Sequence, residues 1–383
     1  MLAIFSFMTD SHHDCSRTPD LGSEFAAHSE IALGIAKGVE AQAIVNPDRA
    51  AFVHKRRELS VDEYFAGIRS GNRTLLARAI TLVESSLPKH QEIAQELIHR
   101  CLPFCGHSIR IGITGVPGAG KSTFIESFGV RLHNHFQRKI AVLAIDPSSQ
   151  VSGGSILGDK TRMTELSVAE DVFIRPSPSG GSLGGVTQKT RETVLICEAA
   201  GFDTILIETV GVGQSETAVH GMVDFFLLLM LAGAGDELQG IKRGIMEMAD
   251  GIAITKADGA NLNKAKLARA EYQNALHLFP PNPWYWAPQV VTTSALEREG
   301  IDDVWTMILA FETKLKEGGF WETRRKEQLR DWMTESIHQG LLQDFHSNEA
   351  VQGEYADLER DVVLGKLSPF LAARRLVNIY RSL

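Results

Sequence analysis

Glycines, a lysine and a serine stand at a fixed spacing in the segment that could bind phosphate. The segment reads Gly115-Val116-Pro117-Gly118-Ala119-Gly120-Lys121-Ser122-Thr123. Its first eight residues follow the pattern G-x4-G-K-S, in which glycines let backbone N–H groups surround an anion. Lys121 is expected to neutralise β- and γ-phosphate oxygens, and Ser122 to offer its hydroxyl to Mg²⁺. The spacing therefore predicts that residues 115–123 bind a nucleoside triphosphate.

Carboxylates that could complete a magnesium site follow two apolar stretches. Glu208 comes directly after residues 204–207 and begins Glu208-Thr209-Val210-Gly211. Asp146 directly follows residues 140–145, a neighbouring predicted strand, and can reach the same place as Glu208. Mg²⁺ prefers such hard oxygen ligands, so we expect Glu208 and Asp146 to serve it. Asp159, within Gly158-Asp159-Lys160, is open on local grounds, because a Gly-Asp turn is common without any role.

A second motif could read a nucleotide base. Thr255-Lys256-Ala257-Asp258 follows the apolar residues 251–254. The Asp258 carboxylate can accept two hydrogen bonds from guanine, a donor pair that adenine lacks. Lys256 would pack its stem along the base. Thr255 stands where asparagine is commoner, which is expected to weaken the affinity for the base.

A third segment supports the same interpretation. Ser294-Ala295-Leu296 follows the last predicted strand and offers backbone N–H groups to the guanine oxygen. The order and spacing of the three motifs predict GTP and GDP as ligands, together with Mg²⁺, rather than ATP.

The residue that follows Glu208-Thr209-Val210-Gly211 predicts slow GTP hydrolysis. Ras-like proteins carry there a glutamine that orients the attacking water. Here the residue is Val212, which cannot form that hydrogen bond, and Gln214 lies two residues further on. We expect slow intrinsic hydrolysis that accelerates when a partner or a loop closure supplies a polar group.

Alternating apolar runs and helical stretches must position these motifs. Strands are predicted at residues 109–113, 140–145, 204–207, 225–230, 251–254 and 290–291, with helices between them. Near-continuous apolar strands indicate a mostly parallel α/β sheet covered on both faces. Ligands of such sheets bind at the carboxyl ends of the strands, which is where every motif falls.

Helical patterns flank this region on both sides. Leu76, Ile80, Val83 and Leu87 predict a helix ending at Pro88, and a second helix should close before Pro103. Helices are also expected at 301–316, 320–342 and beyond, where Phe370, Ala373, Val377 and Tyr380 form a stripe. Packing on the parent domain and a dimer face are equally good explanations of that stripe. We predict a leader and helical extension at 1–105, a nucleotide-binding domain at 106–312 and a helical segment at 313–383.

Composition excludes several classes of function. The chain has 383 residues, is 44% hydrophobic and carries a net charge of −8, which disfavours a general nucleic-acid binder. Its longest apolar run, residues 225–232, is too short to span a bilayer. The first residues match neither a secretory signal nor a mitochondrial presequence, so a cytoplasmic location is expected. Cys101 and Cys105 lack a second ligand pair and are expected to be reduced thiols rather than zinc ligands.

The long motifs as a set resemble the MeaB/ArgK-type GTPases, which are associated with methylmalonyl-CoA mutase and similar to MMAA. The resemblance runs from about residue 75 to the C-terminus. The segments that carry it are Gly115–Thr123, Asp146–Ser149, Gly153–Met163, Arg175–Ser179, Thr190–Glu192, Cys197–Gly201, Glu208–Glu216 and Gly233–Lys242.

The resemblance implies a P-loop GTPase fold and a chaperone of an adenosylcobalamin-dependent acyl-CoA mutase, chiefly methylmalonyl-CoA mutase. It implies a homodimer formed through the C-terminal helices. It also implies Asp146 and Asp159 beside Glu208 at the magnesium site, and Lys242 in a loop that reaches the nucleotide when a partner orders it.

Two alternatives remain. A metallochaperone GTPase of the same glutamate-motif class would display Cys-x-Cys or His-rich segments, and this chain has scattered thiols and imidazoles. A small-molecule kinase, which older transport-system labels for the family suggest, would need an acceptor motif.

Overall fold

The computed structural model describes residues 57–145, 163–176, 183–209, 215–233, 243–280 and 282–382. Leu59–Leu383 form one compact unit. None of the described helices is long and apolar enough to cross a lipid bilayer.

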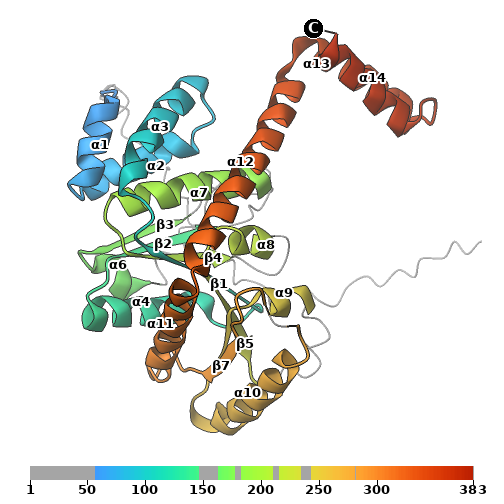
Figure 1. Ribbon diagram of the computed structural model, residues 1–383. Coiled ribbons are helices and arrows are strands. Elements are labelled where there is room, and N and C mark those ends of the chain that lie inside the picture. Colours follow the sequence, from blue (N-terminus) through green and yellow to red (C-terminus); the bar gives the residue numbers. More distant parts are fainter. Residues whose placement is uncertain are drawn as a thin grey trace, which may run out of the picture. The chain divides into compact units, whose positions relative to one another are not determined.

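A parallel sheet lies at the centre of this unit (Figure 1). In the described residues its seven strands are β1 (Ile109–Gly115), β2 (Ile140–Ile145), β3 (Val172–Pro176), β4 (Thr204–Thr209), β5 (Phe225–Leu231), β6 (Gly251–Thr255) and β7 (Gln289–Thr292). Their order across the sheet is β3-β2-β4-β1-β5-β6-β7, and every neighbouring pair is parallel. The predicted α/β fold with a mostly parallel sheet is confirmed.

Strand β3 is the one that the apolar patterns do not predict. Its three apolar residues, 172–174, run into Arg175-Pro176, a sequence typical of a loop. A proline is tolerated here because β3 is the edge strand of the described sheet and pairs with β2 on its inner side.

Helices cover both faces of the sheet, and alternate residues of β2 and β4 belong to two separate cores. The first face carries α4 (Lys121–Phe136), α6 (Thr164–Val168), α9 (Arg243–Met248), α10 (Leu262–Leu276) and α11 (Ile301–Glu317). The second carries α1 (Val61–Arg69), α2 (Arg73–Glu84), α3 (Pro88–Cys101), α7 (Leu183–Ala199) and α8 (Ser215–His220). Two short 3₁₀ helices are η2 (Leu102–Phe104) and η3 (Gly259–Asn261).

The N-terminal helices differ in one detail from the predicted pattern. Helix α2 ends at Glu84, and Leu87 is extended and 57% exposed instead of facing the core. A residue that precedes proline avoids the helical region, and Pro88 instead occupies the first turn of α3. The predicted single helix up to Pro88 is therefore wrong at its last turn.

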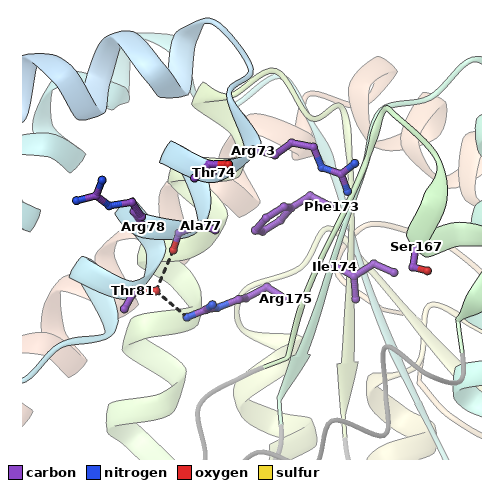
Figure 2. Close-up of a pocket in the computed structure, with 9 residues that line it drawn as sticks. All are labelled: Arg73, Thr74, Ala77, Arg78, Thr81, Ser167, Phe173, Ile174 and Arg175. Atoms are coloured by element: carbon purple, nitrogen blue, oxygen red, sulfur yellow. Dashed lines mark hydrogen bonds between the residues drawn. The ribbon is translucent and has the colours of Figure 1, made fainter. Parts of the chain in front are cut away.

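A cavity of about 620 Å³ lies between α2 and β3 and is lined by three arginines (Figure 2). Arg73 donates to the main-chain oxygens of Ala169 and Val172. Arg175 pairs with Glu84 and reaches the Thr81 hydroxyl. Both guanidinium groups are therefore engaged by the protein itself, and their contacts fasten α2 to β3 at the sheet edge.

Three long helices end the chain, namely α12 (Phe320–Ser347), α13 (Glu349–Val363) and α14 (Pro369–Arg381). Helices α13 and α14 pack together through Val351, Leu358, Ala372 and Leu376. The predicted stripe is divided, because Phe370 is 86% exposed whereas Tyr380 donates to Asp344 Oδ2 at 2.5 Å. The predicted helical C-terminal segment is confirmed.

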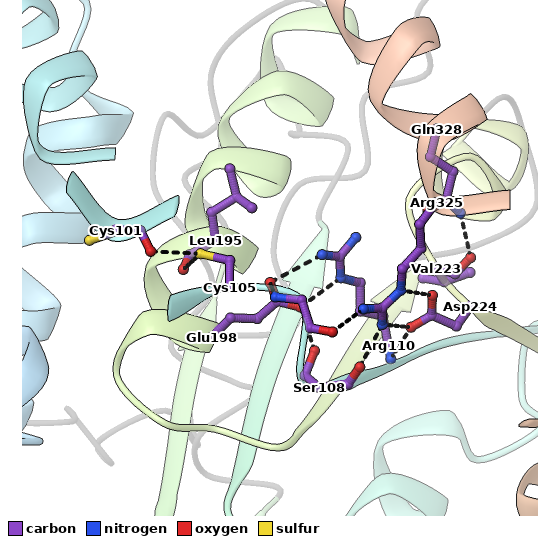
Figure 3. Close-up of polar contacts among 11 residues, drawn as sticks. Cys101, Cys105, Ser108, Arg110, Leu195, Glu198, Val223, Asp224, Arg325 and Gln328 are labelled. Carbon is purple, nitrogen blue, oxygen red and sulfur yellow. Dashed lines mark hydrogen bonds and ion pairs between the residues drawn. The ribbon is translucent and has the colours of Figure 1, made fainter. Parts of the chain in front are cut away.

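Buried ion pairs fasten the start of α12 to the edge of the sheet where the strands begin (Figure 3). Arg325 donates to Asp224 Oδ1 and Oδ2 at 2.9 and 2.7 Å, and Arg110 donates to Glu198 at 2.9 and 3.1 Å. In spite of burial, the neighbouring guanidinium groups hold the pKa values of Asp224 and Glu198 below their ordinary range. Removing one member of such a pair leaves an uncompensated buried charge.

Three thiols lie in or beside the second core. Cys101 and Cys197 are buried, and the Cys105 thiol lies 3.2 Å from the oxygens of both Cys101 and Leu195 (Figure 3). Burial raises the pKa of Cys101 to about 11 and that of Cys105 to about 12, and also raises that of Cys197. These thiols therefore stay protonated at neutral pH.

The imidazole of His220 should make stability depend on pH. Burial, and then Arg324, lower its pKa from the ordinary 6.5, whereas Asp250 opposes them. Below pH 6.5 the imidazole is therefore protonated more readily in the unfolded chain than in the folded chain. The folded state has its full stability above this pH and loses stability as the pH falls below it. We expect the free energy of unfolding in urea to fall from pH 7.5 to 5.5 by at most ~1.4 kcal/mol per pH unit from this group. His220→Gln should reduce that fall and His338→Gln, at an exposed position, should not; equal pH dependence in all three proteins would contradict the assignment.

Candidate nucleotide site

The predicted phosphate loop follows the central strand β1 and opens helix α4. Gly118 and Gly120 have φ angles of 79° and 82°, which residues with a side chain rarely adopt. The start of the loop approaches β5 so closely that a Cβ on Gly115 would lie 2.4 Å from the oxygen of Leu229. The Lys121 ammonium donates to the main-chain oxygen of Gly115 at 3.0 Å, so it curls back over the loop. A helix N-terminus and a lysine thus adjoin the same loop, an arrangement that favours anion binding.

The Ser122 hydroxyl meets Glu208 across two adjacent strands. β1 and β4 pair with Ile113 opposite Glu208, and Ser122 Oγ lies 3.1 Å from Glu208 Oε1. Glu208 is 4% exposed at this place. A hydroxyl and a carboxylate beside a phosphate loop are hard oxygen donors that fit Mg²⁺. Asp146, Asp159, Val212 and Lys242 lie outside the described residues.

Glu216 is a second carboxylate at this site, and the sequence motifs gave it no role. It lies in the first turn of α8 and is fully buried. Burial lowers the pKa of Lys121, whereas Glu208 and then Glu216 oppose this effect. The two carboxylates thus favour a charged lysine. The position of Glu216 at the end of the Glu208–Glu216 segment was the sequence signal that could have indicated a role for it.

The base-reading residues lie at the ends of β6 and β7. Asp258 Oδ2 accepts a hydrogen bond of 2.5 Å from the Ser294 hydroxyl, which joins the two loops. Lys256 has a φ of 56°, a conformation uncommon for a residue with a side chain, and Asn261 donates to its oxygen at 2.7 Å. Such strain persists where the surroundings fix the backbone, and here it fixes the loop that ends in Asp258.

The next loop is anchored to the helix of the phosphate loop. Ser127 of α4 donates to the Ala295 oxygen at 2.6 Å, and the Ser294 and Glu299 main chains form a β-bridge. Leu296 is 78% exposed, so its side chain is available to a ligand or to solvent. The phosphate loop, the candidate magnesium ligands Ser122 and Glu208, and the predicted base-reading loops therefore lie at the carboxyl ends of the strands.

Thr255 connects the two halves of the site. Its hydroxyl lies 2.8 Å from the Ala119 oxygen and 3.1 Å from the Met230 oxygen, and the residue is 4% exposed. The base-reading motif thus holds the phosphate loop through this buried side chain, a contact that the sequence analysis did not foresee.

Thr255→Val, which keeps the shape and removes the hydroxyl, should weaken GTP binding. The Ala119 oxygen loses its donor, and such a loss corresponds to about a threefold to tenfold rise in Kd. Titration with GTP in a calorimeter measures this change, with Thr255→Ser as the control that keeps the hydroxyl. Equal affinity of the valine and serine variants would show that the contact does not support binding.

The comparisons with known proteins agree with this geometry. Residues 76–350 match the family described as "Methylmalonyl Co-A mutase-associated GTPase MeaB". The chain is 47% identical to the GTPase ArgK of Escherichia coli over 319 residues, covering 83% of this chain and 96% of that protein. It is 44% identical over 345 residues to the mouse "Methylmalonic aciduria type A homolog, mitochondrial", covering 88% and 83%.

A solved structure is similar along almost its whole length. This crystal structure, of a protein described as "LAO/AO transport system kinase", has a TM-score of 0.67 and 40% identity, covering 85% of this chain and 99% of that chain. The family match covers more than half of the chain, and the fold and the order of the motifs agree with it. The chain is thus a P-loop GTPase that binds guanine nucleotides and belongs to the family of MeaB-type, methylmalonyl-CoA mutase-associated GTPases.

Proposed function

We propose that this GTPase is a chaperone of an adenosylcobalamin-dependent acyl-CoA mutase, chiefly methylmalonyl-CoA mutase. GTP binding and hydrolysis would gate cofactor loading and protect or reactivate the mutase. The family match over residues 76–350 carries the proposal, because that family is described by its association with methylmalonyl-CoA mutase. The mouse relative, whose name refers to methylmalonic aciduria, supports the same client.

The site residues divide into three groups in this proposal. The phosphates bind the loop of Gly115–Thr123, with Lys121 neutralising their charge. Ser122 and Glu208, with Asp146 and Asp159, hold Mg²⁺, which supplies positive charge to the phosphate oxygens when bound. Asp258, Lys256 and the Ser294–Leu296 loop hold guanine, and Lys242 reaches the nucleotide when a partner is bound.

The proposed homodimer involves the C-terminal helices. Leu329, Met333, Ile337 and Leu341 recur every four residues along α12 and are 52–61% exposed. These four side chains form an apolar stripe along α12 of the kind that marks protein contacts. Sedimentation at increasing concentration should show a dimer, which Ile337→Glu should weaken.

The second candidate function is a small-molecule kinase, because the similar solved structure is described as that of a kinase. The two functions differ in their products. A GTPase releases inorganic phosphate, whereas a kinase transfers it to an acceptor. The metallochaperone alternative would call for Cys-x-Cys or His-rich segments, and this chain has scattered thiols and imidazoles instead.

The test is binding of purified methylmalonyl-CoA mutase to the immobilised full-length protein. We expect retention that differs between GDP and a non-hydrolysable GTP analogue, and a GTP hydrolysis rate that rises when the mutase is added. The control is Lys121→Ala, in which the difference between nucleotides should disappear. Absence of binding in every nucleotide state, or a phosphorylated small molecule as product, would overturn the proposal.

A further inference from the structure

Helix α8 lies directly on the strand that leads into the phosphate loop. It has six residues and is therefore about 9 Å long. A Cβ on Gly112 of β1 would lie 2.9 Å from Val219 Cγ1 and 3.1 Å from Val223 Cγ2. The absence of a side chain at Gly112 thus permits close packing of α8 and its following residues on β1. A displacement of α8 cannot occur without repacking this contact.

Helix α8 also packs on β4, the strand that carries Glu208, and it begins at Ser215, soon after β4 ends at Thr209. Glu216, in its first turn, is fully buried, and the charges of Glu208 and then Glu216 oppose the lowering of the Lys121 pKa by burial. Electrostatic interactions in such a buried place are weakly screened. The position of α8 therefore affects the charge environment of the residue that is proposed to neutralise the phosphates.

The other end of α8 is held by α12. Trp332 Nε1 donates to the Gly221 oxygen at 2.9 Å, and Gln328 Nε2 donates to the Val223 oxygen at 2.7 Å (Figure 3 shows Gln328 with Val223). Trp332 is 8% exposed, and the guanidinium groups of Arg110 and Arg191 lie 5.6 and 5.4 Å from the centre of its ring. Arg325 adds the buried pair with Asp224, the next residue after Val223.

We infer that Trp332 and Gln328 are positioning residues for GTP hydrolysis, acting through α8. One end of this short helix is fixed by α12, and the helix packs on β1 and β4, the strands that lead to the phosphate loop and to Glu208. The nucleotide site and α12 are therefore energetically coupled, and a coupling of this kind is reciprocal. The inference rests on the proposed role of Lys121 and extends it to regulation by contacts on the C-terminal helices.

The test compares two variants of the full-length protein with a matched control. Trp332→Phe and Gln328→Met each remove one donor to the main chain after α8. Trp286→Phe is the matched control, because it also removes an indole donor to the main chain: the ring is buried, lies outside α8 and α12, and donates to the Asp250 oxygen at 2.7 Å. Single-turnover GTP hydrolysis, KM for GTP and thermal unfolding are measured for all three.

We expect kcat to change by about threefold to tenfold in the first two variants while KM stays within about twofold, the range found for coupling residues without ligand contact. Trp286→Phe should lower the melting temperature comparably with little change in kcat. Wild-type kcat in Trp332→Phe and Gln328→Met would reduce the contacts to structural support and overturn the inference.

A second measurement reads the coupling in the opposite direction. Amide hydrogen exchange of residues 326–342 should differ between the GDP complex and the complex with a non-hydrolysable GTP analogue. The difference should shrink in Trp332→Phe. Identical exchange in the two wild-type complexes would overturn the inference. No mutase is present in either experiment, so a wrong client would leave these results unchanged.

Discussion

Replacing Lys121 by alanine should lower kcat/KM for GTP hydrolysis by on the order of 10²–10³-fold, the range for loss of a preorganised charge donor. The ammonium already curls over the loop towards Gly115, and Glu208 and Glu216 favour its charged form. Alanine keeps the helix but leaves the phosphate charge of the transition state uncompensated. Phosphate release under single-turnover conditions measures the effect.

The control for this change is Lys139→Ala. Lys139 directly precedes β2, its side chain is 56% exposed, and it pairs with Asp171 at 3.3 Å. Such a surface pair is worth little, so both stability and turnover should stay close to wild type. If Lys121→Ala retained wild-type kcat/KM, the loop would not be the site of hydrolysis.

Asp258→Asn should change the preferred base from guanine to xanthine. The carboxylate can accept from the N1–H and the exocyclic amine of guanine, whereas an asparagine places one N–H donor there. Xanthine carries an oxygen in place of that amine and can accept from the new donor. We expect GTP affinity to fall by on the order of 10²–10⁴-fold and XTP to bind better than GTP.

Competition between GTP and XTP for the same fluorescent nucleotide measures this switch. Gain of XTP binding separates a change in recognition from simple loss of folding. Asp303→Asn, in the first turn of α11, is the matched control and should retain the preference for GTP. A variant at Asp258 that still preferred GTP would show that another residue reads the base.

The sheet could be predicted because its inner strands are buried on both faces. Residues such as Ile111 and Leu206 have no exposed surface, and such strands appear as unbroken apolar runs in the sequence. The motif positions followed, since each motif directly succeeds a strand and parallel strands end at one edge.

Other features depend on contacts that sequence spacing does not encode. Strand β3 is short and ends in Arg175-Pro176, so its composition does not indicate a strand. Its hydrogen bonds with β2 hold it in the extended conformation. The contact of Thr255 with Ala119 joins residues 136 positions apart. Trp332 and Gln328 lie on α12, and their main-chain acceptors near α8 have no sequence signature. Long-range polar contacts of this kind require coordinates.

The protonated thiols of the second core make site-specific labelling practicable. With a pKa of about 11, Cys101 is a thiolate in roughly one molecule in 10⁴ at pH 7, and Cys105 and Cys197 ionise still less readily. Maleimide reagents attack the thiolate and should therefore pass over all three. With Cys15 replaced by serine, a single cysteine introduced on the exposed side of α12 would be almost the only residue that takes up a spin label or fluorophore. Distances along the C-terminal helices can then be measured in solution without mutating the three thiols of the core.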